Sequence, residues 1–288
     1  MRIAVIGMGS MGRAFAMRAL ERGHQVTVWN RSPGRAATVV AAGAVEAPLE
    51  SAVGAAEVVL LVLSDDEAVL DVCLRDDGIL ASLGSSTVLA NVSTVSPDTV
   101  RRLAAAAPAE RFLDAPVMGA PENVAAGHCR FFIGGALPAI RSCDPLWNDL
   151  SVGYTHCGPV GMASVMKLIS NLLLITGVAS LAEAVATARS HGISDDLLQN
   201  VLSESPVISP TSAIRLKSVL DQEHPGWFSP TLARKDLRLA VGLAQQAGLA
   251  VRVGPATEAL LTTVVESGDE WPDFSAVIEA LDRSTAPD

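Results

Sequence analysis

The chain has 288 residues, 49% of them hydrophobic and 18% charged, and a formal net charge of −10 at pH 7. Such a composition excludes a chain that is disordered over most of its length, and the acidic balance argues against nucleic acid as a general partner. Because one hydrophobic core usually stops growing at about 250 residues, two domains are expected.

The first half of the chain alternates strand-like runs with helix-like runs. Strands are predicted at residues 2–6, 25–29, 57–63, 87–92, 111–117, 129–133 and 152–157. Helical patterns lie between several of them, as at residues 11–23 and 96–107. Near-continuous apolar strands separated by helices predict a parallel sheet that is covered on both faces.

Residues 3–12 read IAVIGMGSMG, a G-x-G-x-x-G pattern between a predicted strand and a predicted helix. Gly7 permits the tight turn, Gly9 lets the backbone approach a pyrophosphate, and Gly12 lets the helix pack closely against the strand. Amides at the N-terminus of that helix then bind the phosphates. The pattern predicts a Rossmann dinucleotide-binding domain over residues 1–160. The predicted cofactor contacts are Gly7, Met8, Gly9, Ser10, Met11 and Gly12.

The second predicted strand ends in VWNRS, where such domains distinguish NAD from NADP. A domain that selects NAD usually places Asp or Glu here to bind the ribose hydroxyls. This chain instead has Asn30, Arg31 and Ser32. A guanidinium can clamp a 2′-phosphate with paired hydrogen bonds, whereas a carboxylate would repel it. NADP(H) is therefore the predicted cofactor, with these three residues as contacts, and an ordinary surface arginine is the alternative for Arg31.

After Gly158 no strand is predicted, and helical patterns rich in alanine and leucine fill residues 161–285. The first helix would continue to about Ser190, a length of about 45 Å that suits an element bridging two domains or two subunits. We expect an all-helical domain over residues 161–288 that forms a homodimer or tetramer through its helices. The final STAPD is predicted to be a frayed end.

Cysteine spacing and hydropathy bear on the location of the protein. The four cysteines are Cys73, Cys129, Cys143 and Cys157. None forms a C-x-x-C pair or stands near a histidine cluster at zinc spacing, so no metal site is predicted. The start MRIAVIG carries no apolar leader, and a cytoplasmic location is expected. Fifteen uncharged residues separate Lys167 from Glu183. This is short of the roughly 20 that span a bilayer, so we expect a buried helix and no membrane partner.

Lys167 stands in an otherwise apolar or small stretch, GPVGMASVMKLISNLLLI. A desolvated ammonium group costs several kcal/mol unless another group compensates it. The lysine can extend from a helix flank to solvent, which is the commoner arrangement. Alternatively it can face a cleft in which its proton is used. The stretch alone favours the first interpretation.

Seven motifs follow one another along residues 1–245. They are IAVIGMGSMG, VWNRS, LVLSDDEAV, NVSTVSPDT, DAPVMG, GPVGMASVMKLISN and FSPTLARKDLRLA. This order resembles the β-hydroxyacid dehydrogenases, the group of 3-hydroxyisobutyrate dehydrogenase and the glyoxylate/succinic semialdehyde reductases. The related imine reductases share the architecture. The resemblance implies an α/β protein with an N-terminal Rossmann domain, a long interdomain helix, an all-α C-terminal domain and an active site in the interdomain cleft.

The resemblance implies that Lys167 is the general acid/base. In the family the catalytic lysine follows a G-x-x-G…K-x-x-x-N pattern, which Gly158, Gly161, Lys167 and Asn171 match. Hydride transfer requires a group that takes or supplies a proton, and burial among apolar neighbours would lower the pKa of a lysine toward neutrality. Asn171, at i+4, can hold the lysine or the substrate oxygen. Ser164, at i−3, is interpreted as a residue that only spaces the helix.

Further contacts are implied by the same resemblance. The implied cofactor contacts are Leu63, Ser64, Thr94 and Lys235. The implied substrate contacts are Ser93, Met118, Gly119, Ala120, Phe228 and Asp236. For Lys235 and Asp236 a solvated helix face is the alternative. Asn91 departs from the pattern, because the family often has Asp there.

The loop after D-A-P-V also departs from the family. The usual continuation is S-G-G or S-G-S, whose serine binds the substrate carboxylate, but here Met118 follows and a thioether cannot donate a hydrogen bond. The spacing of Met118 and Pro121 resembles the imine reductases, which normally replace the helix lysine with Asp or Tyr. We predict an NADP-dependent oxidoreductase acting on a small hydroxy acid or carbonyl. An imine reductase is the first alternative, and a cofactor-binding sensor without turnover is the second.

Overall fold

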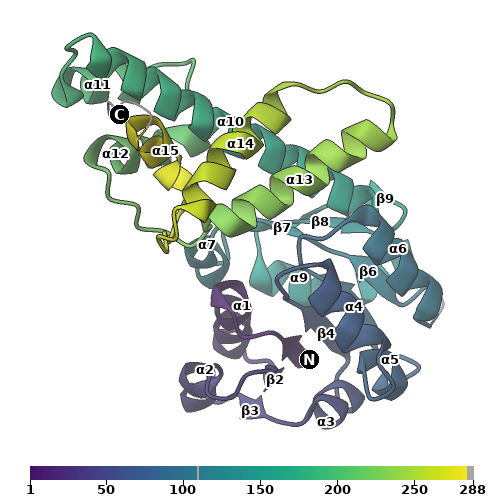
Figure 1. Ribbon diagram of the computed structural model, residues 1–288. Coiled ribbons are helices and arrows are strands. Elements are labelled where there is room, and N and C mark those ends of the chain that lie inside the picture. The colour runs from purple at the N-terminus through teal and green to yellow at the C-terminus, as the bar shows by residue number, and fades with distance from the viewer. Residues whose placement is uncertain (109, 284–288) are drawn as a thin grey trace. The chain divides into compact units, whose positions relative to one another are not determined.

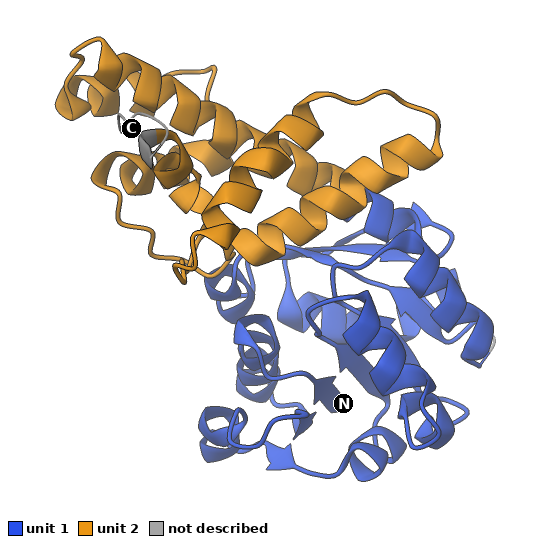
Figure 2. Cartoon of the chain, in the orientation of Figure 1, with its two compact units in different colours: residues 1–167 blue, residues 168–288 orange. Residues whose placement is uncertain are grey.

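The computed structural model describes residues 1–108 and 110–283, with side chains up to Leu281. The chain divides into two compact units, residues 1–167 and 168–288 (Figure 2). The expected domain boundary after residue 160 lies before this division, because Gly161 and Ser164, at the beginning of the long helix that follows, are hydrogen-bonded to Asp114 in the sheet of the first unit. The predicted frayed end STAPD lies outside the described residues.

The first unit contains a sheet of nine strands (Figure 1). Six of them run parallel in the order β3-β2-β1-β4-β5-β6, which is the strand order of a Rossmann fold. These six are β1 Arg2–Ile6, β2 Gln25–Trp29, β3 Val45–Glu46, β4 Val58–Leu61, β5 Val88–Asn91 and β6 Phe112–Asp114. The other three are β7 Val117–Met118, β8 Arg130–Gly134 and β9 Tyr154–Gly158.

The sheet differs from the prediction in three places. The strand predicted at 111–117 is interrupted at Pro116, which has no N–H and whose carbonyl accepts from Phe132 N at 2.9 Å. It therefore forms β6 and β7, and β8 runs antiparallel to both of them. The two-residue strand β3 was not predicted. The sheet is thus mixed rather than entirely parallel. The last strand, β9, pairs with β8 in parallel.

Helices cover both faces of this sheet, as the apolar strands predict. Ile3 and Val5 belong to one buried cluster with Phe15 and Trp147, while the alternate strand residues Ala4 and Ile6 belong to another. This alternation is the two-residue period of a strand buried on both sides. The helices of this unit are α1 Ser10–Glu21, α2 Ala37–Ala41, α3 Leu49–Gly54, α4 Asp66–Leu74, α5 Ile79–Ser82, α6 Pro97–Ala106, α7 Pro121–Ala125, α8 Leu137–Ser142 and α9 Asp144–Leu150.

Among the described residues of the second unit, all the regular secondary-structure elements are helices. Helix α10, Met162–Ser190, begins in the first unit and continues through the second as one element of 29 residues (Figure 1). It is followed by α11 Asp195–Ser203, α12 Pro210–Asp221, α13 Pro230–Gln246, α14 Val253–Glu266, the 3-10 helix η1 Phe274–Ala276 and α15 Val277–Arg283. All of these helices contribute to one hydrophobic core.

Helix α10 is long and apolar enough to cross a membrane by length and composition, with a mean hydropathy of 1.8 in its best window. Of that window, 44% is buried inside the protein. Ile175, Val178, Ala182 and Val185 are completely buried in the core of the second unit. Burial of this stripe accounts for the apolar side chains on this side of the helix.

The four cysteines are free thiols, and three of them are buried. Burial raises the pKa of Cys73 to about 12 and the pKa of Cys129 and Cys143 to about 11. Cys157 is half-buried in β9. Burial raises its pKa as well.

Candidate active site

The loop between β1 and α1 has the geometry that its glycines predict. Gly7 has φ of +103°, and a Cβ there would lie 2.2 Å from the carbonyl oxygen of Val62. A Cβ at Gly12 would lie 1.8 Å from the carbonyl oxygen of Gly7. Gly9 is exposed, with no atom within 4 Å of the position of a Cβ. The loop is therefore tightly packed on its inner side and open at Gly9, which fits a phosphate that approaches the backbone.

Asn30 ties the phosphate loop to the end of β2. Its side-chain Oδ1 accepts from Met8 N at 2.9 Å, and its Nδ2 donates to the carbonyl oxygen of Ser32 at 2.8 Å. The amide of Met8 is thus already bonded within the protein, and the Met8 side chain is completely buried. Arg31 is exposed, as a residue that clamps a phosphate must be. Contacts of these residues with a cofactor stay a prediction.

Ser93 holds the ends of two neighbouring strands together. Its Oγ accepts from Leu63 N at 2.9 Å and donates to the carbonyl oxygen of Leu61 at 3.2 Å. The side chain is buried. Its hydroxyl is therefore bonded to β4 and the loop that follows it, while the neighbouring Thr94 is half-buried. A substrate contact of Ser93 stays a prediction, and the structure gives its side chain a structural role.

Ser64 and Asp65 begin the next helix. Ser64 Oγ donates to Asp65 Oδ2 at 2.6 Å, and Asp65 Oδ1 accepts from Ala68 N at 2.8 Å as the N-cap of α4. Ser64 is exposed and Leu63 is half-buried. The loop after β4 therefore has a fixed backbone and an exposed hydroxyl.

Asn91 and Asp114 are paired in register at the ends of β5 and β6, and both are completely buried. Adjacent strands lie about 4.8 Å apart, so an aspartate at position 91 would place a second buried carboxylate beside Asp114. Asparagine avoids that repulsion. Its Nδ2 donates to the carbonyl oxygen of Ser93 at 3.1 Å, and its Oδ1 has no hydrogen-bond donor among the described residues.

Asp114 is bonded to the beginning of α10. Its Oδ2 accepts from Gly161 N at 3.0 Å and from Ser164 N at 2.9 Å, and its Oδ1 accepts from Ser164 Oγ at 2.6 Å. Burial raises the pKa of Asp114, and the hydrogen bonds from Ser164 and Gly161 act in the opposite direction. The sequence analysis does not identify Asp114 as a site residue, and it interprets Ser164 as a spacing residue. The position of Asp114 at the carboxyl end of a buried strand, in D-A-P-V, is the signal that could have indicated its role in the site.

Lys167 lies on the face of α10 that also carries Ser164 and Asn171. The spacings of three and four residues place these side chains within about one sixth of the helix circumference. Ser164 and Asn171 are buried, and Lys167 is half-buried. The polar face that the K-x-x-x-N pattern predicts is therefore present.

Asn171 is bonded within the second unit. Its Nδ2 donates to Asp236 Oδ2 at 2.6 Å, and Asp236 is also buried. The Nζ of Lys235 lies 2.9 Å from Asp236 Oδ1. Lys235 and Asp236 are thus half-buried and buried rather than part of a solvated helix face. Their contacts with cofactor and substrate stay predictions.

The loop after β7 offers few polar groups. Met118 is 43% exposed at the end of the strand. Gly119 has φ of +137°, and a Cβ there would lie 3.0 Å from the Cβ of Cys129. The amide of Ala120 donates to Asn123 Oδ1 at 2.8 Å, so it is already bonded within the protein. The M-G-A segment therefore presents an apolar side chain where the family pattern has a hydroxyl.

Phe228 is half-buried before α13 and contacts the core of the second unit. Its ring lies edge-on to Phe274 with the centroids 5.3 Å apart, and its carbonyl oxygen accepts from Phe274 N at 2.8 Å. These contacts fix the backbone at Phe228. A contact of the ring with a substrate stays a prediction.

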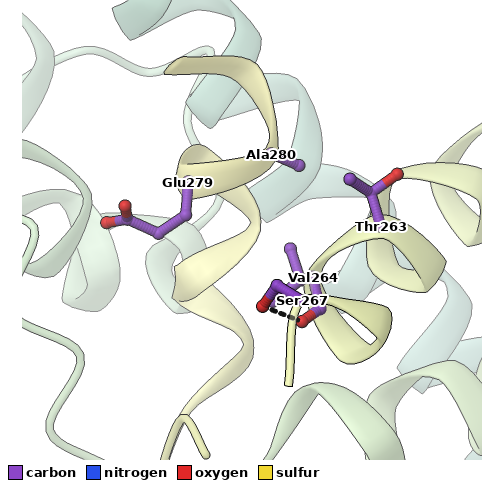
Figure 3. Close-up of a pocket in the computed structure, with 5 residues that line it drawn as sticks. All are labelled: Thr263, Val264, Ser267, Glu279 and Ala280. Carbon is purple, nitrogen blue, oxygen red and sulfur yellow. Dashed lines mark hydrogen bonds between the residues drawn. The ribbon is translucent and has the colours of Figure 1, made fainter. Parts of the chain in front are cut away.

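A small cavity in the second unit is unrelated to these residues. It lies between α14 and α15, is lined by Thr263, Val264, Ser267, Glu279 and Ala280, and has a volume of about 10 Å³ (Figure 3). This is the lower limit for a single water molecule, so the cavity cannot admit a dinucleotide or an organic substrate. Within the described ranges, no group of three His, Cys, Asp or Glu side chains is placed to hold a metal ion.

Comparison with known proteins identifies the family. Residues 2–158 match the NAD binding domain of 6-phosphogluconate dehydrogenase, and residues 161–281 match the NAD-binding domain of NADP-dependent 3-hydroxyisobutyrate dehydrogenase. The chain is 31% identical to the NAD-dependent L-serine dehydrogenase of Pseudomonas aeruginosa, over 98% of both chains. It is 30% identical to the 3-hydroxyisobutyrate dehydrogenase of the same organism, over 96% of both chains.

The chain belongs to the β-hydroxyacid dehydrogenase family. It is accordingly a pyridine-nucleotide-dependent oxidoreductase, which argues against the sensor without turnover. Psf3, in a solved complex with NADP+ and 2-OPP, superimposes with a TM-score of 0.87 at 26% identity, covering 97% of this chain and 99% of that one. An imine reductase from Pseudomonas sp. superimposes with a TM-score of 0.63 at 21% identity, covering 97% and 98%. The imine reductase shares the fold alone.

Proposed function

We propose that this β-hydroxyacid dehydrogenase uses NADP(H) to transfer a hydride to or from a small hydroxy acid or carbonyl substrate, with Lys167 as the general acid/base. The observation that carries the proposal is the position of Lys167 on α10, one turn from Ser164 and one from Asn171. Both neighbours are buried and donate to carboxylates. The helix face that carries the lysine is therefore held in one orientation, as a proton-transfer group requires.

The residues of the first unit fit a dinucleotide. The amides at Gly9, Ser10 and Met11 would hold the phosphates, since the backbone is open there and begins a helix. Exposed Arg31 would clamp a 2′-phosphate, and no carboxylate at position 30 would repel it. When bound, NADP(H) supplies or accepts the hydride. Among the similar proteins, one is named NAD-dependent and another is solved in complex with NADP+.

Lys167 would donate its ammonium proton to the substrate oxygen during reduction and take the proton back during oxidation. The neighbouring Asn171 has its Nδ2 occupied by Asp236, which leaves Oδ1 as the acceptor for the lysine or for a substrate hydroxyl. The two side chains lie one turn apart on one helix face, so the acceptor is placed beside the proton that moves.

The loop at Met118 favours a less polar substrate than that of the family pattern. Its thioether cannot donate to a carboxylate, and the Ala120 amide is already bonded to Asn123. The same observation favours an imine reductase as the second candidate. Lys167 argues for carbonyl chemistry, because the helix carries the lysine of the dehydrogenase pattern.

The test uses the purified enzyme with NADPH and a panel of aldehydes, keto acids and cyclic imines, followed by NADPH absorbance. We expect turnover with carbonyl substrates, and Lys167→Met should reduce kcat by about 10² to 10⁴-fold without weakening NADPH binding measured by fluorescence. Turnover confined to imines would replace the proposal by its second candidate. Near-normal kcat in the variant would show that the lysine only extends to solvent.

A further inference from the structure

The first turn of α10 lacks a local N-cap. The residue before the helix is Gly161, which has no side chain and φ of +95°. The first amides of a helix have no partner within it. Here the carboxylate of Asp114, from a strand 47 residues earlier, accepts from Gly161 N and Ser164 N. A buried side chain of the sheet thus caps the helix.

Three hydrogen bonds fix this turn in more than one direction. Asp114 Oδ2 accepts two amides along the backbone, while Oδ1 accepts the hydroxyl of Ser164 at 2.6 Å. The amides set the height of the helix above the strand. The hydroxyl sets its rotation about its own axis, since Ser164 lies on one face only. Asp114 itself is held at the end of β6, which pairs with β5 and β8.

The preceding turn is also held against the sheet. Gly135 N donates to the carbonyl oxygen of Gly158 at 2.9 Å. A Cβ at Gly134 would lie 2.7 Å from the carbonyl oxygen of Pro159. The chain therefore enters α10 from a turn that is packed on β8, and the backbone around the carboxylate has little freedom to compensate for its loss.

Lys167 lies three residues after Ser164, about 4.5 Å along the helix axis. A rotation or shift of the first turn therefore moves the Nζ of Lys167 directly. A displacement of about 1 Å at a reacting group can cost about 10²-fold in rate. The distance over which the bonds of Asp114 act is thus short enough to matter for proton transfer.

We infer that Asp114 is a positioning residue for Lys167 and acts through the Ser164 hydroxyl and the first turn of α10. This inference rests on the proposed role of Lys167 as the general acid/base. It assigns no contact between Asp114 and the substrate. Asp114 would set the position of the Lys167 ammonium group, so its replacement should change kcat and not the affinity for the cofactor.

Four variants separate position from charge. Asp114→Asn keeps the shape: its Oδ1 can accept the two amides, and its Nδ2 can donate to Ser164 Oγ with the hydroxyl reversed. Ser164→Ala removes one hydrogen bond and keeps the carboxylate, while Asp114→Ala removes all three. As a matched control, Thr87→Val removes a buried hydroxyl that donates to the carbonyl oxygen of Ala56 in the same unit.

We expect Asp114→Asn and Thr87→Val to keep kcat within about threefold. Ser164→Ala should lower kcat about tenfold, and Asp114→Ala about 10²-fold, each with an NADPH dissociation constant within about twofold of the original. If Asp114→Ala fails to fold, Ser164→Ala carries the test. Unchanged kcat in Ser164→Ala, or a loss of equal size in Thr87→Val, would overturn the inference.

A double-mutant cycle identifies the route of the effect. If Asp114 acts through Lys167, Ser164→Ala should cause no further loss of kcat in the Lys167→Met background, measured by single turnover. An undiminished tenfold loss there would show that Ser164 acts independently, and the inference would be wrong. Wild-type turnover in Lys167→Met alone would instead contradict the proposed function, so the two failures are distinguishable.

Discussion

The amide of Asn171 is oriented by Asp236, which accepts its Nδ2 at 2.6 Å. An ionised carboxylate only accepts hydrogen bonds, so the nitrogen of the amide, and not its oxygen, must face Asp236. The oxygen of Asn171 is thereby directed elsewhere. A residue on α13 thus determines what the K-x-x-x-N face of α10 presents to its surroundings.

Removing this acceptor should destabilise the protein. We expect Asp236→Ala to lower the free energy of unfolding by about 1–3 kcal/mol, because it leaves a buried Nδ2 unpaired. The double variant Asn171→Ala with Asp236→Ala should lose less than the sum of the two single losses. Urea denaturation measures all three. Strict additivity would mean that the 2.6 Å contact has little energetic weight.

Arg31 should govern the preference for NADP(H). A charge-assisted hydrogen bond contributes about 1.5–3 kcal/mol, so Arg31→Ala should weaken NADP(H) binding about 10- to 100-fold. NAD(H) binding, measured by the same fluorescence titration, should change little because NAD(H) has no 2′-phosphate. Arg35→Ala is the neighbouring control, since that side chain is also exposed. Equal affinity of the unmodified enzyme for both cofactors would contradict the assignment.

Met118 should limit activity on small hydroxy acids. Met118→Ser restores a hydroxyl donor at the end of β7, and a hydrogen bond to an anion contributes about 1.5–3 kcal/mol. We therefore expect kcat/KM for 3-hydroxy acids to rise about tenfold or more, with little change for matched uncharged substrates. A strong preference of the unmodified enzyme for the acids would show that Met118 does not exclude them.

Asp114 should make stability depend on pH in a defined direction. Burial raises the pKa of Asp114 in the folded state. In the pH interval between the ordinary carboxyl pKa and this raised pKa, the folded protein therefore binds more protons than the unfolded chain. Its contribution to the free energy of unfolding therefore falls as pH rises through the folded-state pKa. Asp114→Asn cannot titrate, so its stability relative to the unmodified protein should increase over that interval. Denaturation of both proteins from pH 3 upward tests this, and a constant difference would be the contrary result.

A second apolar stripe of α10, which is exposed, should form the predicted contact between subunits. Met162, Met166, Ile169 and Leu173 recur at helical spacing and remain exposed, with Leu173 69% exposed. Exposed apolar stripes of this kind mark contacts with other chains. We expect a dimer or tetramer by light scattering, and Leu173→Asp should weaken association about tenfold or more. The control Val207→Asp, at an exposed loop position, should leave association unchanged. If the unmodified protein is a monomer, the expectation is wrong.

Local patterns predicted much of this structure. The strand at Arg2–Ile6, the turn at Gly7 and the helix α10 each depend on residues adjacent in sequence, and each is found where expected. The direction of β8 could not be predicted, because it depends on how the loop after Met118 reverses the chain. The short strand β3 has too few residues for a two-residue period to show.

The contacts that organise the candidate site are non-local. Asp114 and Ser164 are 50 residues apart, and Asn171 and Asp236 are 65 apart. A sequence shows that these residues are polar within apolar surroundings, but not which of them meet. The sequence therefore does not identify Asp114, and it does not show that Asp236 bonds to Asn171.

The different burial of the four cysteines allows one of them, Cys157, to be labelled selectively. A maleimide reacts with thiolate, and burial keeps Cys73, Cys129 and Cys143 protonated and out of reach. Cys157 stands immediately before Gly158, at the entrance to α10, and is the more accessible thiol. Mildly alkaline labelling, which offsets its raised pKa, would therefore attach one fluorophore beside the turn without any substitution. Its emission could then follow, in real time, whether that turn moves when NADP(H) is added.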